Sequence, residues 1–95
     1  MAYTIKLTEE AKNDLKGMFN YYLQETMDEE YTRQIIGEIR KKLDDLKIFP
    51  LRYPPINPED ETIRAMYYKR YAIAYEVLSD MVIILNVKHT SRGDS

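Results

Sequence analysis

The sequence is poor in the residue types on which many metal and redox sites depend. Its 95 residues include no cysteine, one histidine and three glycines. Without cysteine the chain has no disulfide, no thiol nucleophile and no thiolate ligand for a metal ion. A single histidine effectively excludes a histidine-based metal centre, and three isolated glycines exclude a glycine-rich phosphate loop. We therefore expect neither a metal ion nor a cofactor.

Long hydrophobic runs are missing as well. No apolar segment approaches the roughly 20 residues that span a bilayer, and the first ten residues lack the basic start and apolar core of a signal peptide. Hydrophobic residues make up 44% of the chain and charged residues 32%, as is typical of a globular domain. We expect residues 1–95 to form one cytoplasmic domain that does not contact a membrane.

The charge of the chain is small overall but unevenly distributed. The formal net charge is −2, yet residues 63–92 contain five bases and two acids, a net +3 that leaves −5 for the remainder. A basic segment on an acidic body is compatible with a phosphate-bearing or acidic partner. The same cations equally suit strand edges and turns, where they stay solvated and discourage aggregation.

This basic segment carries the strongest structural pattern of the chain. Residues 71–77 alternate large side chains with small or polar ones, which predicts a half-buried strand. Residues 81–87 are apolar at almost every position, as expected for a strand that is covered on both faces. Residues 63–68 form a third run of the same kind. The short breaks between the three runs predict an antiparallel meander.

The front of the chain predicts one short strand and two helices. Residues 3–7 alternate apolar and polar side chains, as in a strand. Thr8 and Asp28 are each followed by two acids, the pattern of a helix N-cap with negative charge in the first turn. Pro50 ends the second helix. The short connection between the helices implies an antiparallel hairpin over about residues 8–49.

The remaining segment, residues 51–62, contains three prolines and is predicted to be a rigid, extended loop that is neither helix nor central strand. Gly17 and Gly37 lie within the helices but away from their apolar stripes, so we expect both to be exposed. The apolar pattern predicts a core that includes Ile5, Leu15, Met18, Tyr22, Ile35, Ile39, Leu46, Ile73, Tyr75 and Ile84.

One group of side chains could act on phosphate. It consists of basic residues interleaved with strand tyrosines, namely Arg64, Lys69, Arg70, Lys88, His89 and Arg92 with Tyr67, Tyr68, Tyr71 and Tyr75. Arginine stabilises charge that develops on phosphate, histidine or tyrosine transfers protons, and aromatic rings stack on bases. Tyr71 and Tyr75 are interpreted instead as packing residues of the predicted middle strand.

The chain resembles the RelE/ParE superfamily of bacterial toxins from type II toxin–antitoxin modules. The resemblance covers nearly the whole chain. Its most specific parts are the Y-x-I-x-Y-x-V pattern of residues 71–77 and the V-x-H-x-x-R ending at residues 87–92, with an initial YTIKL strand and a proline-rich connector in support. It implies an α+β fold of order β-α-α-β-β-β, in which an antiparallel helical hairpin packs on one face of an antiparallel sheet.

The superfamily has a RelE-like branch that cleaves mRNA in the ribosomal A site and a ParE-like branch that inhibits DNA gyrase. RelE-like members usually carry an arginine directly after the aromatic residue that opens the middle strand, where this chain has Ala72 after Tyr71. The preceding strand offers only Arg64 as a base, and the chain ends Gly93-Asp94-Ser95 without a closing tyrosine. The ending at His89 and Arg92, together with the overall acidity, favours the ParE-like branch.

The resemblance thus implies a toxin that inhibits DNA gyrase by protein–protein contact and that binds a cognate antitoxin. The expected assembly is either a homodimer or a toxin–antitoxin hetero-oligomer. Apolar side chains on both faces of residues 81–87, where one hairpin covers a single face, favour such a partner. The predicted target-binding residues are Arg64, Lys69, Arg70, His89 and Arg92. One alternative is a ribosome-dependent mRNA endonuclease in which Arg64, Arg70 and Arg92 hold phosphate and His89 or a tyrosine transfers a proton. Another is a non-toxic binding module with a degenerate toxin fold.

Overall fold

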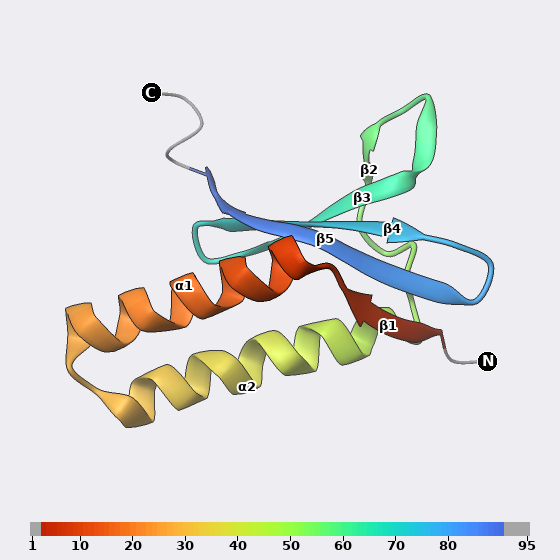
Figure 1. The fold of residues 1–95 in the computed structure, drawn as a ribbon. Helices are drawn as coiled ribbons and strands as arrows, with labels where there is room; N and C mark the ends of the chain where they lie inside the picture. The colour runs from red at the N-terminus through yellow and green to blue at the C-terminus, as the bar shows by residue number, and fades with distance from the viewer. Residues whose placement is uncertain (1–2, 91–95) are drawn as a thin grey trace.

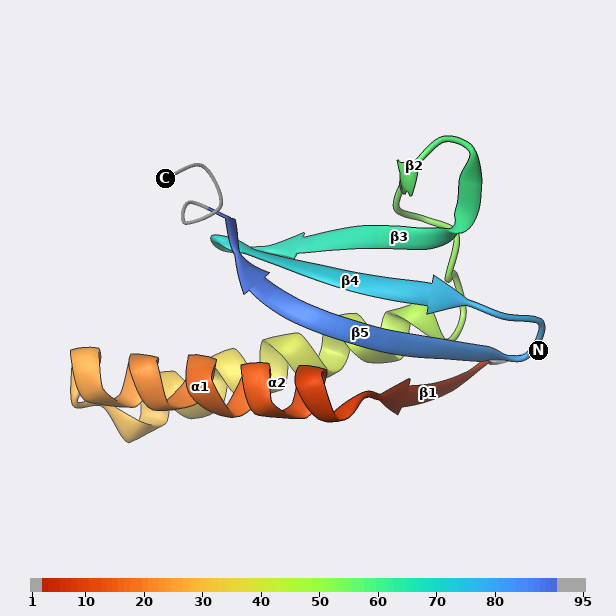
Figure 2. The same cartoon turned by 45° about the horizontal axis from the view of Figure 1, so that its top comes forward.

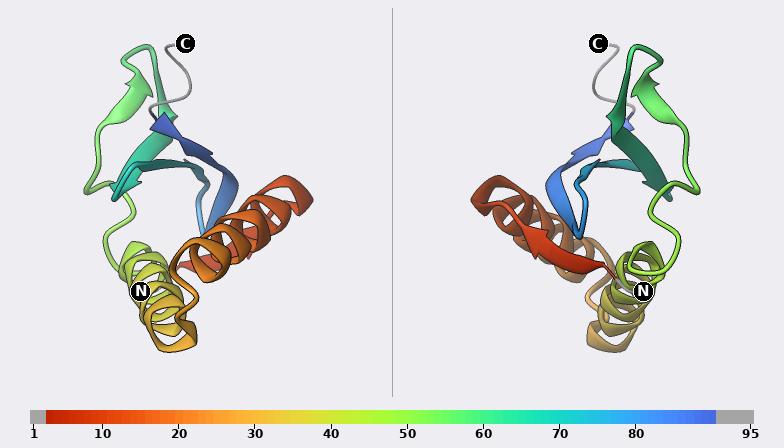
Figure 3. Two further views of the ribbon diagram at one scale, coloured as in Figure 1. Left: turned by 90° about the vertical axis from the view of Figure 1, so that its left-hand side faces the viewer. Right: turned by 90° about the vertical axis from the view of Figure 1, so that its right-hand side faces the viewer.

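The computed structural model describes residues 3–90, which form an α+β fold (Figure 1). Its elements follow one another in the order β1 (Thr4–Leu7), α1 (Glu9–Thr26), α2 (Glu29–Leu46), β2 (Pro55–Asn57), β3 (Asp60–Tyr68), β4 (Tyr71–Val77) and β5 (Met81–His89). The two helices lie side by side on one face of the sheet (Figures 2 and 3). The predicted initial strand, helical hairpin and terminal meander are confirmed.

The five strands form one mixed sheet in the order β1-β5-β4-β3-β2. β1 pairs in parallel with β5, with Thr4 opposite Met81, and the other neighbouring strands are antiparallel. The expectation of a purely antiparallel sheet is therefore wrong. No tight turn connects β1 to β5, since most of the chain separates them, and such a long crossover allows two strands to run in parallel.

The connector between α2 and the sheet contains a strand where the sequence predicted only a loop. The three residues of β2 pair with β3 at the outer edge of the sheet, with Asn57 opposite Asp60. An edge strand accepts Pro55, because the missing N–H of proline can face outwards from the sheet. The Asn57 side chain accepts the Glu59 N–H at 3.0 Å within the turn. β3 consequently begins at Asp60 rather than at Ile63.

Both helices begin at the predicted N-caps. Thr8 Oγ1 accepts the Ala11 N–H at 3.0 Å and donates to the Leu85 carbonyl at 2.7 Å, which fastens the start of α1 to β5. Asp28 Oδ1 accepts the Tyr31 N–H at 3.0 Å at the start of α2. Each bond satisfies an N–H group that a helix leaves unpaired in its first turn. Neither helix combines the length and the apolar composition needed to cross a membrane.

The core lies between the helical hairpin and the sheet. Three of the ten predicted core residues, Ile5, Leu15 and Tyr22, are only partly buried, while the other seven are buried. On β5, Val82 and Ile84 are buried, whereas Ile83 between them has intermediate exposure. β5 therefore presents apolar side chains to both faces of the sheet, and the hairpin covers one of them.

Gly17 in α1 and Gly37 in α2 are both exposed, as the sequence predicted. A Cβ atom added to either glycine would meet no other atom within 4 Å. Neither glycine therefore marks a close contact between the helices.

Candidate target-binding site

Two of the predicted site residues, Lys69 and Arg70, form the turn that joins β3 to β4. The pair Tyr68 and Tyr71 closes the turn, and both cations between them are exposed. Lys69 adopts the left-handed conformation with φ of 54°, which a two-residue hairpin turn requires. Its ammonium lies 5.5 Å from the centre of the Tyr68 ring. Neither Lys69 nor Arg70 forms an ion pair with a carboxylate of residues 3–90.

His89 ends β5 at the same end of the sheet (Figures 1 and 2). It is the cross-strand partner of Tyr71, and the two rings meet edge to face with centroids 5.1 Å apart. Thr90 follows, and its N–H and hydroxyl both donate to the Arg70 carbonyl, at 2.7 and 3.1 Å. The structure thus brings Lys69, Arg70 and His89 together. Arg92 lies outside the described residues.

Arg64, by contrast, lies away from this group and is buried, with 8% of its surface exposed. It sits on the inward face of β3 opposite Tyr75. Its Nη1 donates to the carbonyl of Tyr53 at 2.7 Å and to that of Leu51 at 3.4 Å. Within residues 3–90 its buried Nε has no hydrogen-bond partner. Arg64 therefore holds the connector onto the sheet, a position from which it cannot present its charge to a target without rearrangement.

The tyrosines beneath the turn are protonated at neutral pH. The Tyr68 hydroxyl donates to the Glu38 carboxylate of α2, which ties that helix to the last residue of β3. Burial, and then the bond to Glu38, raises the pKa of Tyr68 above the usual tyrosine range. Burial, and then Tyr71, likewise raises the pKa of Tyr22, whose ring lies 6.4 Å from that of Tyr71. Neither hydroxyl is therefore suited to accept a proton as a general base.

Lys88 belonged to the predicted phosphate-binding group, but the structure pairs it with α1. Its Nζ lies 2.9 Å from the Glu10 carboxylate and 3.1 Å from that of Asp14. These hydrogen bonds, with Glu10 first, raise the pKa of Lys88. Asp14 also accepts the Val87 N–H at 3.0 Å. The contacts of Glu10, Asp14 and Glu38 could not be predicted, because acids on a helix face give no local signal of the distant strand residues that they contact.

Comparison with known proteins identifies the family of the chain. Residues 5–93 match the sequence model of a protein family, described as the ParE toxin of the type II toxin–antitoxin system parDE. The chain belongs to this family. No curated protein sequence matches it significantly.

Solved structures share the fold of this ParE-family toxin. A chain of the chromosomal ParDE toxin–antitoxin system of P. aeruginosa is 16% identical, with a TM-score of 0.73, and the match covers 93% of this chain and 96% of that one. A chain of the toxin–antitoxin complex RelBE2 of Mycobacterium tuberculosis is 22% identical, with a TM-score of 0.62 and coverage of 94% and 99%. A conserved hypothetical protein of Helicobacter pylori is 21% identical, with a TM-score of 0.53 and coverage of 96% and 97%.

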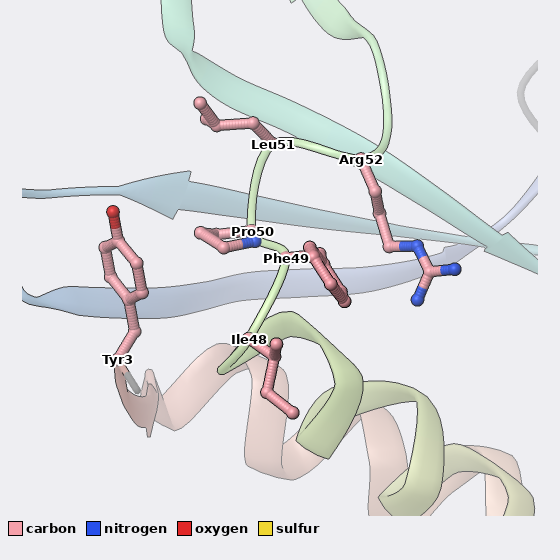
Figure 4. Close-up of a pocket in the computed structure, with 6 residues that line it drawn as sticks. All are labelled: Tyr3, Ile48, Phe49, Pro50, Leu51 and Arg52. Carbon is pink, nitrogen blue, oxygen red and sulfur yellow. The ribbon is translucent and has the colours of Figure 1, made fainter. Parts of the chain in front are cut away.

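This ParE-family chain also displays an apolar surface at the start of its connector, which we call the connector patch. Ile48, Phe49 and Leu51 are 59–62% exposed. Together with Tyr3, Pro50 and Arg52 they line an open hollow of about 480 Å³ (Figure 4). The patch is formed by consecutive residues after α2, so it would have been visible in the sequence as the apolar run Ile48-Phe49-Pro50-Leu51. Exposed apolar groups that gather in this way are typical of protein-binding surfaces.

Proposed function

We propose that this ParE-family toxin arrests growth by binding DNA gyrase through the β3–β4 turn and the end of β5, without cleaving a bond itself. The observation that carries the proposal is the grouping of Lys69, Arg70 and His89 at one end of the sheet, where the two turn cations have no carboxylate partner among residues 3–90. Unpaired cations on a turn are free to meet an acidic protein surface or DNA held by the enzyme. Arg92, three residues beyond His89, is included in the proposed site.

The position of Ala72 supports gyrase over the ribosome as the target. Ala72 faces Tyr67 on β3 and Lys88 on β5, and it cannot supply the guanidinium expected of the nuclease branch there. Lys88 is engaged by two carboxylates, and Arg64 is engaged by backbone carbonyls. Tyr22 and Tyr68, whose pKa values are raised, also lack a deprotonated oxygen that could act as a general base.

The proposal is tested with purified protein, gyrase and ribosomes. We expect loss of supercoiling or gyrase-dependent DNA cleavage, and no cuts in A-site mRNA. Substitution of Lys69 and Arg70 by alanine should weaken the effect on gyrase at least tenfold. The matched control is alanine at Lys16 and Lys41, two exposed lysines of the helices that remove the same charge. A-site mRNA cleavage with gyrase untouched would select the nuclease alternative. Full activity of the turn variant would exclude this site.

A cognate antitoxin is the proposed partner, and the connector patch is the surface we assign to it. Relatives with this fold include chains of ParDE and RelBE2 toxin–antitoxin systems. Induced expression of the toxin alone should stop growth, and co-expression of the adjacent reading frame should restore it. Growth that continues without the partner would instead support a non-toxic binding module. Phe49→Asp should weaken co-purification with the partner, while Leu78→Asp, at an exposed apolar residue elsewhere, should not.

A further inference from the structure

A second hollow lies between α1 and the last residues of β5, on the helix side of the sheet (Figure 1 shows the two elements side by side). It has a volume of about 420 Å³, within the range of roughly 300–1,000 Å³ that is usual for ligand sites. The residues that line it include three with rings, two with charged side chains and one glycine, namely Tyr21, Tyr71, His89, Asp14, Lys88 and Gly17. We call it the Gly17 hollow.

Gly17 contributes no side chain to this hollow. Glycine within a helix is less favourable than alanine, and a Cβ atom here would meet nothing within 4 Å. The packing of the described chain therefore gives no reason for glycine at this position. Gly37 has equally open surroundings but is not among the residues that line the hollow, so a helical glycine alone does not mark a site. The rings and charges around Gly17 make the difference.

The ring of Tyr21 is accessible to a planar ligand, whereas Tyr71 beside it is largely buried. Tyr21 is half exposed on α1, one turn after Gly17. On the strands, the ring of Tyr71 is held at 81° to that of His89. Stacking of a nucleobase on an aromatic side chain is favourable and tolerates any base.

Asp14 and Lys88 form the charged wall of the hollow. Their contacts hold them in positions from which they can hydrogen-bond to the edge of a polar ligand. Asp14 is held by the Val87 N–H at 3.0 Å and by the Lys88 ammonium, and Lys88 is held in turn by Glu10 at 2.9 Å. A carboxylate has about four acceptor sites and an ammonium three donors, so this pair retains hydrogen-bonding capacity for a ligand. An apolar side chain from a partner protein would leave that hydrogen-bonding capacity unused.

The turn next to the strand residues of the hollow carries two cations that could contact an attached phosphate. Tyr71 and His89 adjoin the turn of Lys69 and Arg70, and Thr90 fastens the end of β5 to the Arg70 carbonyl at 2.7 Å. The turn cations form no ion pair among residues 3–90, so they are available to a phosphate.

We propose that the Gly17 hollow binds a nucleobase whose attached phosphate contacts the turn of Lys69 and Arg70. The base stacks on the half-exposed ring of Tyr21, beside the Tyr71–His89 pair, and its polar edge meets Asp14 and Lys88. Such a ligand is either a free nucleotide or an unstacked base of a nucleic-acid strand. Binding is measured on the isolated protein and is therefore independent of whether gyrase is the target.

The test is a titration of the isotope-labelled protein with the four nucleoside 5′-monophosphates, followed by amide NMR shifts. Shifts should concentrate on residues 14–21 and 87–90, and the affinity should fall at least tenfold in Gly17→Leu, which fills the hollow. The matched control Gly37→Leu makes the same change in α2 and should stay within twofold. Circular dichroism checks that both variants fold. Tyr21→Ala provides a second route, since loss of the half-exposed ring should also weaken binding severalfold.

The remaining probes distinguish the base from the phosphate as the source of affinity, and a free nucleotide from a nucleic-acid strand as the ligand. Inorganic phosphate that binds as tightly as a nucleotide would overturn the proposal, as would N-acetyltyrosinamide binding more tightly than any nucleotide, because the hollow would then accept a protein side chain. Equal loss of binding in Gly17→Leu and Gly37→Leu, or no shift at saturating nucleotide, would overturn it as well. A four-nucleotide single strand that binds more tightly than a monophosphate supports the strand as the source, and equal or weaker binding supports the free nucleotide.

Discussion

The hydroxyl of Tyr75 offers the sharpest test of how the connector is held. Tyr75 lies at the centre of β4 with no exposed surface, and its hydroxyl donates to the carbonyl of Pro50 at 2.7 Å. Burial is the first cause that raises the pKa of Tyr75, so the donor proton is present at neutral pH. Tyr75→Phe removes one oxygen atom and leaves the packing of the ring unchanged. It also leaves the buried Pro50 carbonyl without this donor.

We expect Tyr75→Phe to lower the free energy of unfolding by about 1–3 kcal/mol, the cost of a lost hydrogen bond with one buried partner left behind. For a domain of this size each kcal/mol corresponds to a fall in Tm of about 4–8 °C. Urea denaturation should show a lower midpoint at an unchanged m-value. The control is Tyr67→Phe, since Tyr67 is 60% exposed and its change should stay within about 0.5 kcal/mol. Equal stability of the two variants would refute the reasoning.

Three further substitutions test other parts of the structure. Gly37→Ala should raise the free energy of unfolding by up to about 1 kcal/mol in urea denaturation, because the helix gains propensity and the added Cβ meets no atom. Asp28→Ala should cost about 1 kcal/mol by removing the N-cap of α2, and Asp28→Asn, which preserves a capping oxygen, should cost much less by the same measurement. Tyr68→Phe tests the raised pKa of Tyr68: the native state holds the phenolic proton more tightly, so the stabilisation is complete below about pH 10 and is lost as the pH rises through the native pKa. The variant should therefore lose less stability above pH 10 than the wild type does, and an unchanged alkaline limb of the pH–stability curve would contradict this.

Local sequence signals predicted the helices and most strands, but they did not predict the parallel pairing of β1 with β5. Thr8 and Asp28 are each followed directly by two acids, a local signal of a helix start, and both predicted N-caps are confirmed. The parallel pairing of Thr4 with Met81 depends on residues 77 positions apart, and no turn residue marks it. β2 has three residues, too few to show a period of two, and Pro55 within it, with Pro54 and Pro58 on either side, predicts an irregular segment.

The candidate site was predicted in part for the same reason. Lys69, Arg70 and His89 lie at a turn and a strand end that the alternation of apolar residues already located. The alternation of inward and outward side chains along β3 distinguishes Arg64 from these residues. It shares its face with Met66 and Tyr68, both buried, so a strict alternation places Arg64 inwards as well. The charge of Arg64 predicts a ligand-binding residue, whereas its position in the strand predicts burial, and the structure confirms burial.

Arg64 and Tyr75 together explain why the connector patch is exposed and yet held in place. The two residues are cross-strand partners on the inward face of the sheet. The guanidinium of Arg64 donates to the carbonyls of Leu51 and Tyr53, and Tyr75 donates to that of Pro50, so two side chains anchor the backbone on which the patch is displayed. Backbone carbonyls in place of a carboxylate partly offset the cost of burying the charge of Arg64. A surface ordered in advance loses less conformational entropy when a partner binds. The buried arginine thus orders the connector patch from beneath, in the segment that we propose binds the antitoxin.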